Sequence, residues 1–453
     1  MQTSDEARCR TGSKFARIFF SLVLVISLAP TFPSSALADD QQSADSTTMA
    51  EGEAWDGTFD YSWYNTTDTS FTITTPEQLA GLARIVNGYA SGIDQDNFTG
   101  KTITLGADII LNSQTYSEQN SSARAWTPIG DVNTSSGSDS SMYFNGTFDG
   151  NGHVIKNIYI DGSVSNPGAY GGYQGLFGAI GSDAVIENVG IDGGYIYGRV
   201  AGGIAAISHT DSPSSMPHII GCFNTANIAG NGSTSRGAGG IFGGEDRNGD
   251  HTASEADAYR AACYIANCYN TGTINGSTSG PAGGIAGTGS NMIYSCYNVG
   301  TINSSSSYAG SIVGNVYATG SIPAGDFDAC GVVVDSYALS GTHTTCYNLI
   351  GEGQDKSAAT AVTDYFKTES QLKESGAAAL FSQSFVDVSD GYPQLYWQAG
   401  DSQIDISTAN ATVSEIDTQL YTGSAIEPEF TVTVPDSDSS SSEEITLKEG
   451  SDY

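Results

Sequence analysis

The sequence predicts an all-β protein whose main body is a right-handed parallel β-helix, a solenoid in which each turn of the chain stacks on the turn before it. Glycine occurs 56 times in 453 residues, and this composition favours short strands and turns over helices. A glycine-rich motif and a cysteine-containing motif also recur alternately along the chain. Such repeats are typical of solenoids. A two-sheet or barrel-like all-β fold is the alternative.

The glycine-rich motif has the form G-x-[IL]-x-[GA] and occurs as "GLFG", "GGIAA", "GGIFG", "GGIAG" and "GSIVG". The apolar centres are separated by 28, 37, 44 and 27 residues and are Leu176, Ile204, Ile241, Ile285 and Ile312. These intervals indicate a period near 28 residues with insertions. Insertions in a solenoid are expected to loop outward, where binding is commonly found.

The second motif, I-x-x-C-[YF]-N-x-x-x-I, is centred on Cys222, Cys268 and Cys296. Alignment of the remaining chain places Ile158, Val189 and Ser336 in the same column as these cysteines. Because side chains alternate along a strand, Cys268 and Asn270 are expected to face the interior, with Ile274 facing in on the next strand. The aliphatic members of the column favour cysteine as a small buried apolar residue.

By the same alternation, Tyr269 is expected to point outward. With Tyr297 and Phe223 it would form an exposed aromatic ladder, one ring per turn of the solenoid. Such a ladder could contact glycans or protein. Packing of the rings on one another, which stabilises the outer face, is the alternative interpretation.

The N-terminus predicts export. Arg8, Arg10, Lys14 and Arg17 precede an apolar run from Ile18 to Leu28, and Ala36-Leu37-Ala38 is an A-x-A cleavage signature. We expect a signal peptide over 1–38, cleaved before Asp39, and a secreted or cell-wall-associated product. Residues 39–453 would carry 48 acidic residues (50 less Asp5 and Glu6) and 12 basic ones (16 less four). This charge disfavours nucleic acid and anionic lipid as partners, and no second apolar run of membrane length follows.

We expect a flexible linker over 39–54, an N-terminal α/β cap over 55–143, the β-helix over 144–350 and a C-terminal cap over 351–400. In the N-terminal cap, Thr75 is the predicted N-cap of a helix that starts at Pro76 and stops at Asn87-Gly88. The C-terminal cap contains a short helix in "TDYFKTESQLKES". Tyr392, Leu395 and Trp397 are then expected to seal the final turn of the solenoid.

The other candidate chemistry is sparse, and the sequence predicts no cofactor, metal or catalytic site. Cys222, Cys268 and Cys296 lack the paired spacing of zinc ligands. Six cysteines remain after export, and of the loop cysteines Cys263, Cys330 and Cys346, the last two form the most plausible disulfide. In "DRNGDHTASEAD", Asp246, Asn248, Asp250 and Asp257 match part of a calcium loop, but His251 occupies its glycine position. An acidic solvated loop is the simpler interpretation.

The set "FTITTPEQLAGLARIVN", "WTPIGD", "FNGTFDGNGHVIKNIYI", "AGGIAG", "CYNVGTIN" and "DGYPQLYWQ" resembles bacterial surface proteins that carry GLUG repeats, across roughly 55–400. Residues 401–453 resemble the opening of a bacterial immunoglobulin-like repeat, incomplete at Tyr453, as in a truncated chain. Similar repeats precede IgA-specific metallopeptidase domains, but the five histidines here form no H-E-x-x-H motif. The resemblance implies surface display and attachment to the cell wall through a downstream segment.

The expected function is therefore a non-enzymatic, adhesin-like binding or spacer role toward host glycans, extracellular matrix or cell-surface proteins. The alternative is a carbohydrate-active β-helix enzyme, a polysaccharide lyase or hydrolase, for which Asp246 and Arg260 would be the residues to change. Fold alone does not distinguish these functions.

Overall fold

The computed structural model describes residues 52–115, 123–131, 142–162, 172–209, 216–231, 237–244, 263–288, 291–306, 309–315, 332–334, 336–340, 366–381 and 384–398, and three short strands after residue 411. All of these residues belong to one compact unit, Ala50–Tyr453. The predicted signal peptide lies outside the described residues. Within the described part, no helix is both long and apolar enough to cross a bilayer.

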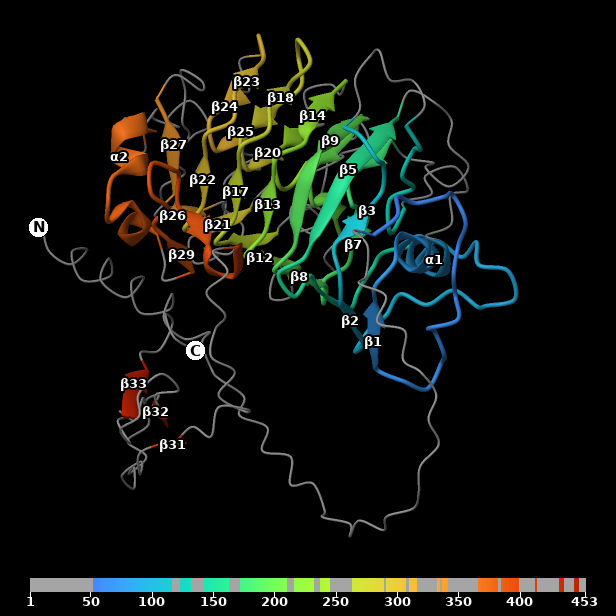
Figure 1. Cartoon of the computed structure of the whole chain (residues 1–453). Coiled ribbons are helices and arrows are strands. Elements are labelled where there is room, and N and C mark those ends of the chain that lie inside the picture. Colours follow the sequence, from blue (N-terminus) through green and yellow to red (C-terminus); the bar gives the residue numbers. More distant parts are fainter. Residues whose placement is uncertain are drawn as a thin grey trace, which may run out of the picture. The chain divides into compact units, whose positions relative to one another are not determined.

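The described chain is mostly β-structure, as its composition predicts, and its larger sheets are parallel (Figure 1). The first, which we name sheet A, contains eight strands that follow one another in chain order. They are β1 (Ser70–Ile73), β2 (Thr102–Leu105), β4 (Thr147–Asp149), β8 (Val185–Glu187), β12 (His218–Ile220), β16 (Tyr264–Ala266), β21 (Met292–Tyr294) and β26 (Val332–Val334).

Sheet B is also parallel, and its long strand β9 pairs with both β13 and β14. Its strands are β3 (Ile109–Ile110), β5 (Val154–Asp161), β9 (Gly190–Gly198), β13 (Phe223–Asn224), β14 (Asn227–Gly230), β17 (Tyr269–Asn270), β18 (Ile274–Asn275), β22 (Tyr297–Asn298), β23 (Ile302–Asn303), β27 (Tyr337–Leu339) and β28 (Phe366–Lys367).

The third group of strands contains a five-stranded sheet and two strand pairs. The sheet comprises β6 (Tyr173–Gln174), β10 (Val200–Gly202), β15 (Ala238–Gly239), β19 (Ala282–Gly283) and β24 (Ala309–Gly310). The pairs are β7 (Phe177–Ile180) with β11 (Ala205–Ser208), and β20 (Ala286–Thr288) with β25 (Val313–Asn315). Parallel bridges through Phe242 connect β11 to β20.

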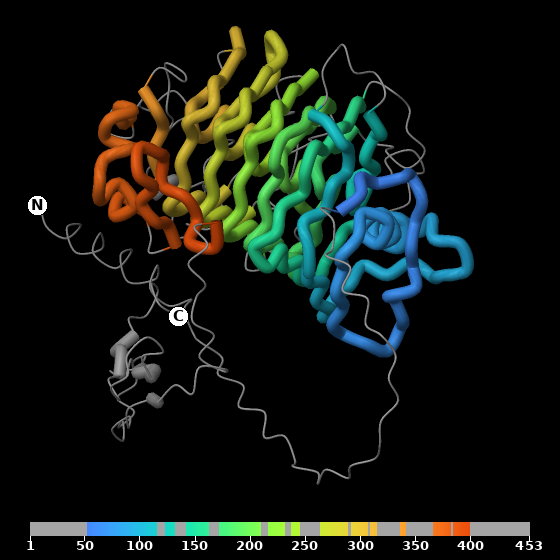
Figure 2. The backbone as a smooth tube through the Cα atoms, in the orientation of Figure 1, coloured from blue at the N-terminus to red at the C-terminus, as the bar shows by residue number. Residues whose placement is uncertain are grey.

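The chain passes through sheet A, sheet B and the third group in turn, and we call each passage a rung. Successive rungs lie side by side in chain order (Figure 2). The predicted glycine-motif column is confirmed, because its neighbours pair in parallel register from Phe177 through Ala205, Phe242 and Ala286 to Val313. Its five apolar centres are all fully buried.

The glycines of this motif are required by close approach between rungs. A β-carbon on Gly284 would lie 2.1 Å from the Ser311 carbonyl oxygen and 2.3 Å from Cγ of Asn298. Real β-carbons do not approach so closely. The glycines of the motif therefore mark positions where the backbones of adjacent rungs are in close contact.

The predicted cysteine column is confirmed for Val189, Cys222, Cys268, Cys296 and Ser336, but its placement of Ile158 is wrong. Ile158 pairs with Gly194, beyond the column. Phe148 pairs with Ile186, and Val154 pairs with Gly190. Between these two paired positions the earlier rung is six residues long, whereas the later rung is four residues long. The turn after Asp149, whose carboxylate accepts the Asn151 N–H at 2.8 Å, contains the extra residues. Alignment by motif did not detect them.

An asparagine ladder lies two residues after the cysteine column. Asn224, Asn270 and Asn298 are fully buried, and each amide donates to the next, with both contacts at 2.8 Å. Each amide also closes its own turn by bonding the backbone two residues later. The ladder thus satisfies buried polar groups that the apolar columns cannot.

Helix α1 (Pro76–Val86) follows the predicted limits, with Thr75 as N-cap and Asn87 as C-cap. Its apolar face, which includes Leu79, Leu82 and Ile85, belongs to the same buried cluster as the rungs. The Asn87 side chain donates to the Pro128 carbonyl at 2.9 Å and accepts from the Gly130 N–H at 2.8 Å. The N-terminal region and the rungs therefore share one core.

The chain after residue 365 adds β28 to sheet B and then forms α2 (Glu369–Lys373), the short helix that the sequence predicts; its N-cap is Thr368. It continues through 3₁₀ helices at Ala377–Leu380 and Tyr396–Gln398, with an antiparallel pair between them, β29 (Phe385–Val386) and β30 (Gln394–Leu395). Another antiparallel sheet, of β31 (Thr412–Val413), β32 (Val432–Pro435) and β33 (Glu444–Leu447), occurs after residue 411.

Candidate functional site

The cysteines of the repeat are core residues. Cys222, Cys268 and Cys296 are fully buried and free, and the backbone N–H groups of Cys222 and Cys268 each approach the sulfur of the next rung at 3.4 Å. Burial raises the pKa of the Cys222 and Cys268 thiols well above the usual value. Such thiols are poor nucleophiles and poor metal ligands.

The remaining predicted candidates are divided between the core and the undescribed segments. Cys263, expected in a loop, is buried in the core at the start of β16, with a free thiol. Cys330, Cys346, Arg260 and the calcium-like positions Asp246, Asn248, Asp250 and Asp257 lie outside the described residues. No group of metal-binding side chains occurs among the residues that are described.

The predicted aromatic ladder exists, but the expectation that it is exposed is wrong. Phe223 stacks on Tyr269 at 5.2 Å between ring centroids, and Tyr269 on Tyr297 at 4.9 Å, with nearly parallel rings. The rings point outward from sheet B, yet Tyr269 is 5% and Tyr297 1% exposed. The ladder is therefore a buried contact within the fold.

The cover over the ladder is the segment 384–398, which was expected to seal the final rung. Instead, the Trp397 indole stacks on Phe223 at 5.7 Å and donates to the Gly221 carbonyl at 3.0 Å. The Tyr269 hydroxyl bonds the Gln398 side chain, and the Tyr297 hydroxyl donates to the Pro393 carbonyl. The segment thus runs back along the outside of earlier rungs, because the aromatic rings there offer the apolar area to bury.

A pair of carboxylates lies on the outer face of sheet A. Asp149 and Glu187 are direct neighbours on the parallel strands β4 and β8. Partial burial raises the pKa of Glu187, and the adjacent Asp149 charge raises it further. A raised carboxyl pKa beside a second acid is a feature of general acid catalysis, although structural pairs also produce it.

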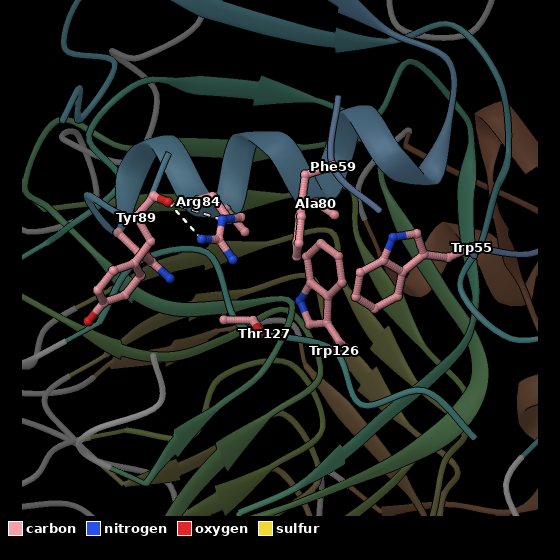
Figure 3. Close-up of a pocket in the computed structure, with 9 residues that line it drawn as sticks. Trp55, Phe59, Ala80, Arg84, Tyr89, Trp126 and Thr127 are labelled. Atoms are coloured by element: carbon pink, nitrogen blue, oxygen red, sulfur yellow. Dashed lines mark hydrogen bonds between the residues drawn. The ribbon is translucent and has the colours of Figure 1, made fainter. Parts of the chain in front are cut away.

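A recess in the N-terminal region carries the most distinctive set of side chains. It is lined by α1, by the segment before β1 and by the segment after residue 123 (Figure 3). The aromatic wall consists of Trp55, Trp126 and Phe59, with Trp55 edge-on to Trp126 at 6.0 Å. Phe59 is the exposed large apolar side chain of the described chain, at 39%. The other lining residues are Ala80, Ala83, Arg84, Asn87, Tyr89 and Thr127.

The recess is held rigidly by internal hydrogen bonds. The Trp55 indole donates to the Thr58 carbonyl at 2.8 Å, and the Trp126 indole to the Leu176 carbonyl at 3.2 Å. Arg84 donates from Nε and Nη2 to the Tyr89 carbonyl at 3.1 and 2.8 Å (Figure 3). Its guanidinium lies 4.4 Å from the centroid of the Phe59 ring. Aromatic faces and a fixed cation are therefore present before any ligand arrives.

Arg84 has no carboxylate as a close partner in the described part of the chain. Lys101, Lys156 and Lys373 each form an ion pair with a carboxylate. Among the described residues, Arg84 has only the Phe59 ring and a backbone carbonyl as close partners. In a protein of net charge −34, a cation that faces a recess without a carboxylate partner is a candidate ligand contact.

The sequence reasoning did not find this recess. The signal available was the distribution of tryptophan, because three of the four tryptophans, Trp55, Trp63 and Trp126, precede the first repeat motif. The recess joins residues from three separate segments, and their proximity depends on the fold.

No family model matches the chain. No curated protein matches it either. Among solved structures, the chain is similar to one named "putative immunoglobulin A1 protease" from Bacteroides ovatus, with 17% identity and a TM-score of 0.47. The match covers 73% of this chain and 94% of that one. At this level the likeness does not indicate an activity.

Proposed function

We propose that this protein is a secreted or cell-surface, non-enzymatic, adhesin-like repeat protein that binds host glycans, extracellular matrix or cell-surface proteins. Its rungs form a right-handed parallel β-helix of the GLUG type, followed by an immunoglobulin-like segment that leads toward a cell-wall attachment. The parallel, chain-ordered sheets support the β-helix. The right hand follows the strong preference of parallel crossover connections, and the signal sequence supports export.

The observation that carries this proposal is the recess of Trp55, Phe59, Trp126 and Arg84. Phe59 is exposed, whereas Trp55 and Trp126 are buried behind it. An exposed aromatic ring with a fixed polar neighbour suits the mixed apolar and hydroxylated faces of sugars, and also suits protein side chains. The rungs supply a support of parallel, chain-ordered sheets. The contact of an exposed Phe59 with an arginine that has no close carboxylate partner among the residues that the structure describes favours a binding role over a passive spacer.

The proposal is tested with the exported chain, residues 39–453, on arrays of host glycans and matrix proteins. We expect binding, weakened about tenfold or more by Phe59→Ala, since loss of one aromatic contact can remove ~1.5 kcal/mol or more. Tyr294→Ala is the matched control, because Tyr294 is a half-buried aromatic residue of sheet A, remote from the recess. Absence of binding, or equal effects of both variants, would leave the spacer role.

The second candidate function is a carbohydrate-active enzyme, favoured by the Asp149–Glu187 pair. A protonated Glu187 could donate to a glycosidic oxygen, with Asp149 as the second carboxyl group of the pair. Turnover of polysaccharides that is present in the natural protein and abolished by Glu187→Gln would support this function and overturn the non-enzymatic one. We expect neither the natural chain nor the variant to show turnover.

A further inference from the structure

We propose that the recess beside Arg84 recognises the carboxylate group of an acidic saccharide, such as a uronic or sialic acid. The inference rests on the proposed binding function and names its ligand class. It follows from the size of the recess, from the free hydrogen-bonding capacity of Arg84 and from the exposure of Phe59.

The size of the recess limits what it can enclose. Its cavity volume is about 20 Å³, and about 10–15 Å³ measured in this way is enough for one water molecule. The recess therefore holds one small substituent and cannot enclose a whole sugar ring. The ring would remain at the mouth, where Phe59 is 39% exposed and available for stacking.

The hydrogen-bonding capacity of the recess favours an anionic substituent. The two indole N–H groups and the Asn87 amide already bond backbone groups. Arg84 uses Nε and Nη2 on the Tyr89 carbonyl, which leaves N–H donors of the guanidinium fork for a ligand. Arginine donors match carboxylate oxygens and bond them more strongly than neutral acceptors.

Charged groups of both signs surround the recess. Arg124 Nη1 lies 2.7 Å from the position of a β-carbon on Gly57, two residues before Phe59, and Arg124 interacts electrostatically with Asp56. Glu77 also lies nearby, since its side chain accepts from the Asp56 N–H. Selectivity for a carboxylate would therefore come from the hydrogen-bond donors of Arg84 and not from a general positive field.

A purely structural role for Arg84 is the competing explanation, because it lies in the last turn of α1 and bonds a nearby carbonyl. The two roles differ in one readout. A structural arginine affects every ligand equally, whereas a carboxylate-binding arginine discriminates between an acidic saccharide and the same saccharide with its carboxyl reduced to an alcohol.

The experiment measures binding of the exported chain to glucuronate- and sialate-terminated oligosaccharides and to their carboxyl-reduced forms by calorimetry. We expect the natural protein to prefer the acidic forms about tenfold or more, since hydrogen bonds to charged groups contribute ~1.5–3 kcal/mol. Arg84→Gln should abolish this preference, and Arg84→Lys should restore part of it. Phe59→Ala should weaken acidic and reduced forms by the same factor.

Lys367→Gln is the matched control, because Lys367 also lies over an aromatic ring, that of Tyr337 at 4.6 Å, away from the recess. A preference that survives Arg84→Gln, or one that Lys367→Gln also removes, would overturn the inference while leaving glycan binding intact. Failure of the natural protein to bind any glycan or matrix protein would overturn both the inference and the proposed function.

Discussion

Replacement of Asn270 with alanine is expected to destabilise the fold by about 3–5 kcal/mol. The Asn270 amide takes part in four hydrogen bonds. It donates to the Gly272 carbonyl at 2.9 Å and to Oδ1 of Asn298 at 2.8 Å. It accepts from the Gly272 N–H at 3.2 Å and from Nδ2 of Asn224 at 2.8 Å. All three asparagines are fully buried, so water cannot replace what the substitution removes.

The magnitude follows from the partners that remain. A hydrogen bond contributes a net ~0.5–1.5 kcal/mol, and a buried group left without a partner costs ~1–3 kcal/mol. Asn224 keeps its bond to the Ala226 carbonyl, and Asn298 keeps its own turn. The Gly272 turn loses both side-chain bonds. The expected loss of stability is therefore smaller than the cost of four buried groups left without partners, and larger than the cost of one. Asn298→Ala, which removes three such bonds, is expected to cost less.

The assay is urea unfolding of residues 39–453, followed by circular dichroism, and the m-value is expected to stay unchanged. The control is Asn303→Ala, which breaks an exposed contact between asparagines of adjacent rungs, Nδ2 of Asn303 to Oδ1 of Asn275 at 3.0 Å. This exposed bond is expected to contribute within ~0.5 kcal/mol. If Asn270→Ala costs no more than the control, the ladder is not what stabilises the rungs and the reasoning fails.

Three further predictions concern the core, the cover and the carboxylate pair. Cys268→Val should change the free energy of unfolding by less than ~1.5 kcal/mol, because Val189 occupies the same column. Site-resolved mass spectrometry should also show that the buried thiols do not react with thiol reagents until urea unfolds the chain; these are Cys222, Cys263, Cys268 and Cys296. Tyr297→Ala should lower the free energy of unfolding by about 3–5 kcal/mol, measured by calorimetry, since the ring is 1% exposed beneath the segment 384–398. Tyr294→Ala should lower it clearly less, because Tyr294 is only half-buried. Similar losses of stability in the two variants would contradict the burial of the ladder. The fold raises the pKa of Glu187 above its value in the unfolded chain. The contribution of the Glu187 side chain to folding stability is therefore present below the pKa of the unfolded chain, and it is lost as pH rises through the pKa of the folded protein. Unfolding free energies of the natural chain and of Glu187→Gln should therefore show the variant gaining relative stability from pH 4 to pH 7, and a constant difference would refute the shift.

The interior of the rungs was predictable because it depends on local alternation. A strand residue faces in or out by its parity, so Cys268, Asn270 and Ile274 could be placed from the sequence. The helix limits at Thr75 and Asn87 were predictable because capping is local chemistry. The placement of Ile158 was wrong because it depended on the length of a turn and not on alternation. The turn after Asp149 contains extra residues between two columns, and the spacing of the motif does not reveal them.

Exposure was less predictable than direction. Tyr269 points outward, as its parity predicts, but the sequence does not show that Trp397 and Gln398, more than a hundred residues later, cover it. The recess was missed for a related reason. Trp55, Arg84 and Trp126 belong to segments without a shared motif, and only the packing of α1 brings them together. Long-range contacts of this kind follow from the whole fold.

The regularity of the rungs explains why a binding site is expected outside them. A column that repeats from rung to rung presents the same kind of group at every step. The cysteine, asparagine and glycine-motif columns face inward, and the Phe223–Tyr269–Tyr297 ladder lies under the segment 384–398. The rings of His218, Tyr264 and Tyr294 form a further, half-buried column on sheet A. A selective site needs different groups at fixed distances. Such a set occurs where the repeat ends, at α1, because a helix there meets an aromatic wall from two other segments. If the recess is the binding site as proposed, lengthening the stack by further rungs would leave its ligand unchanged, whereas substitution of Phe59 or Arg84 would change what it binds.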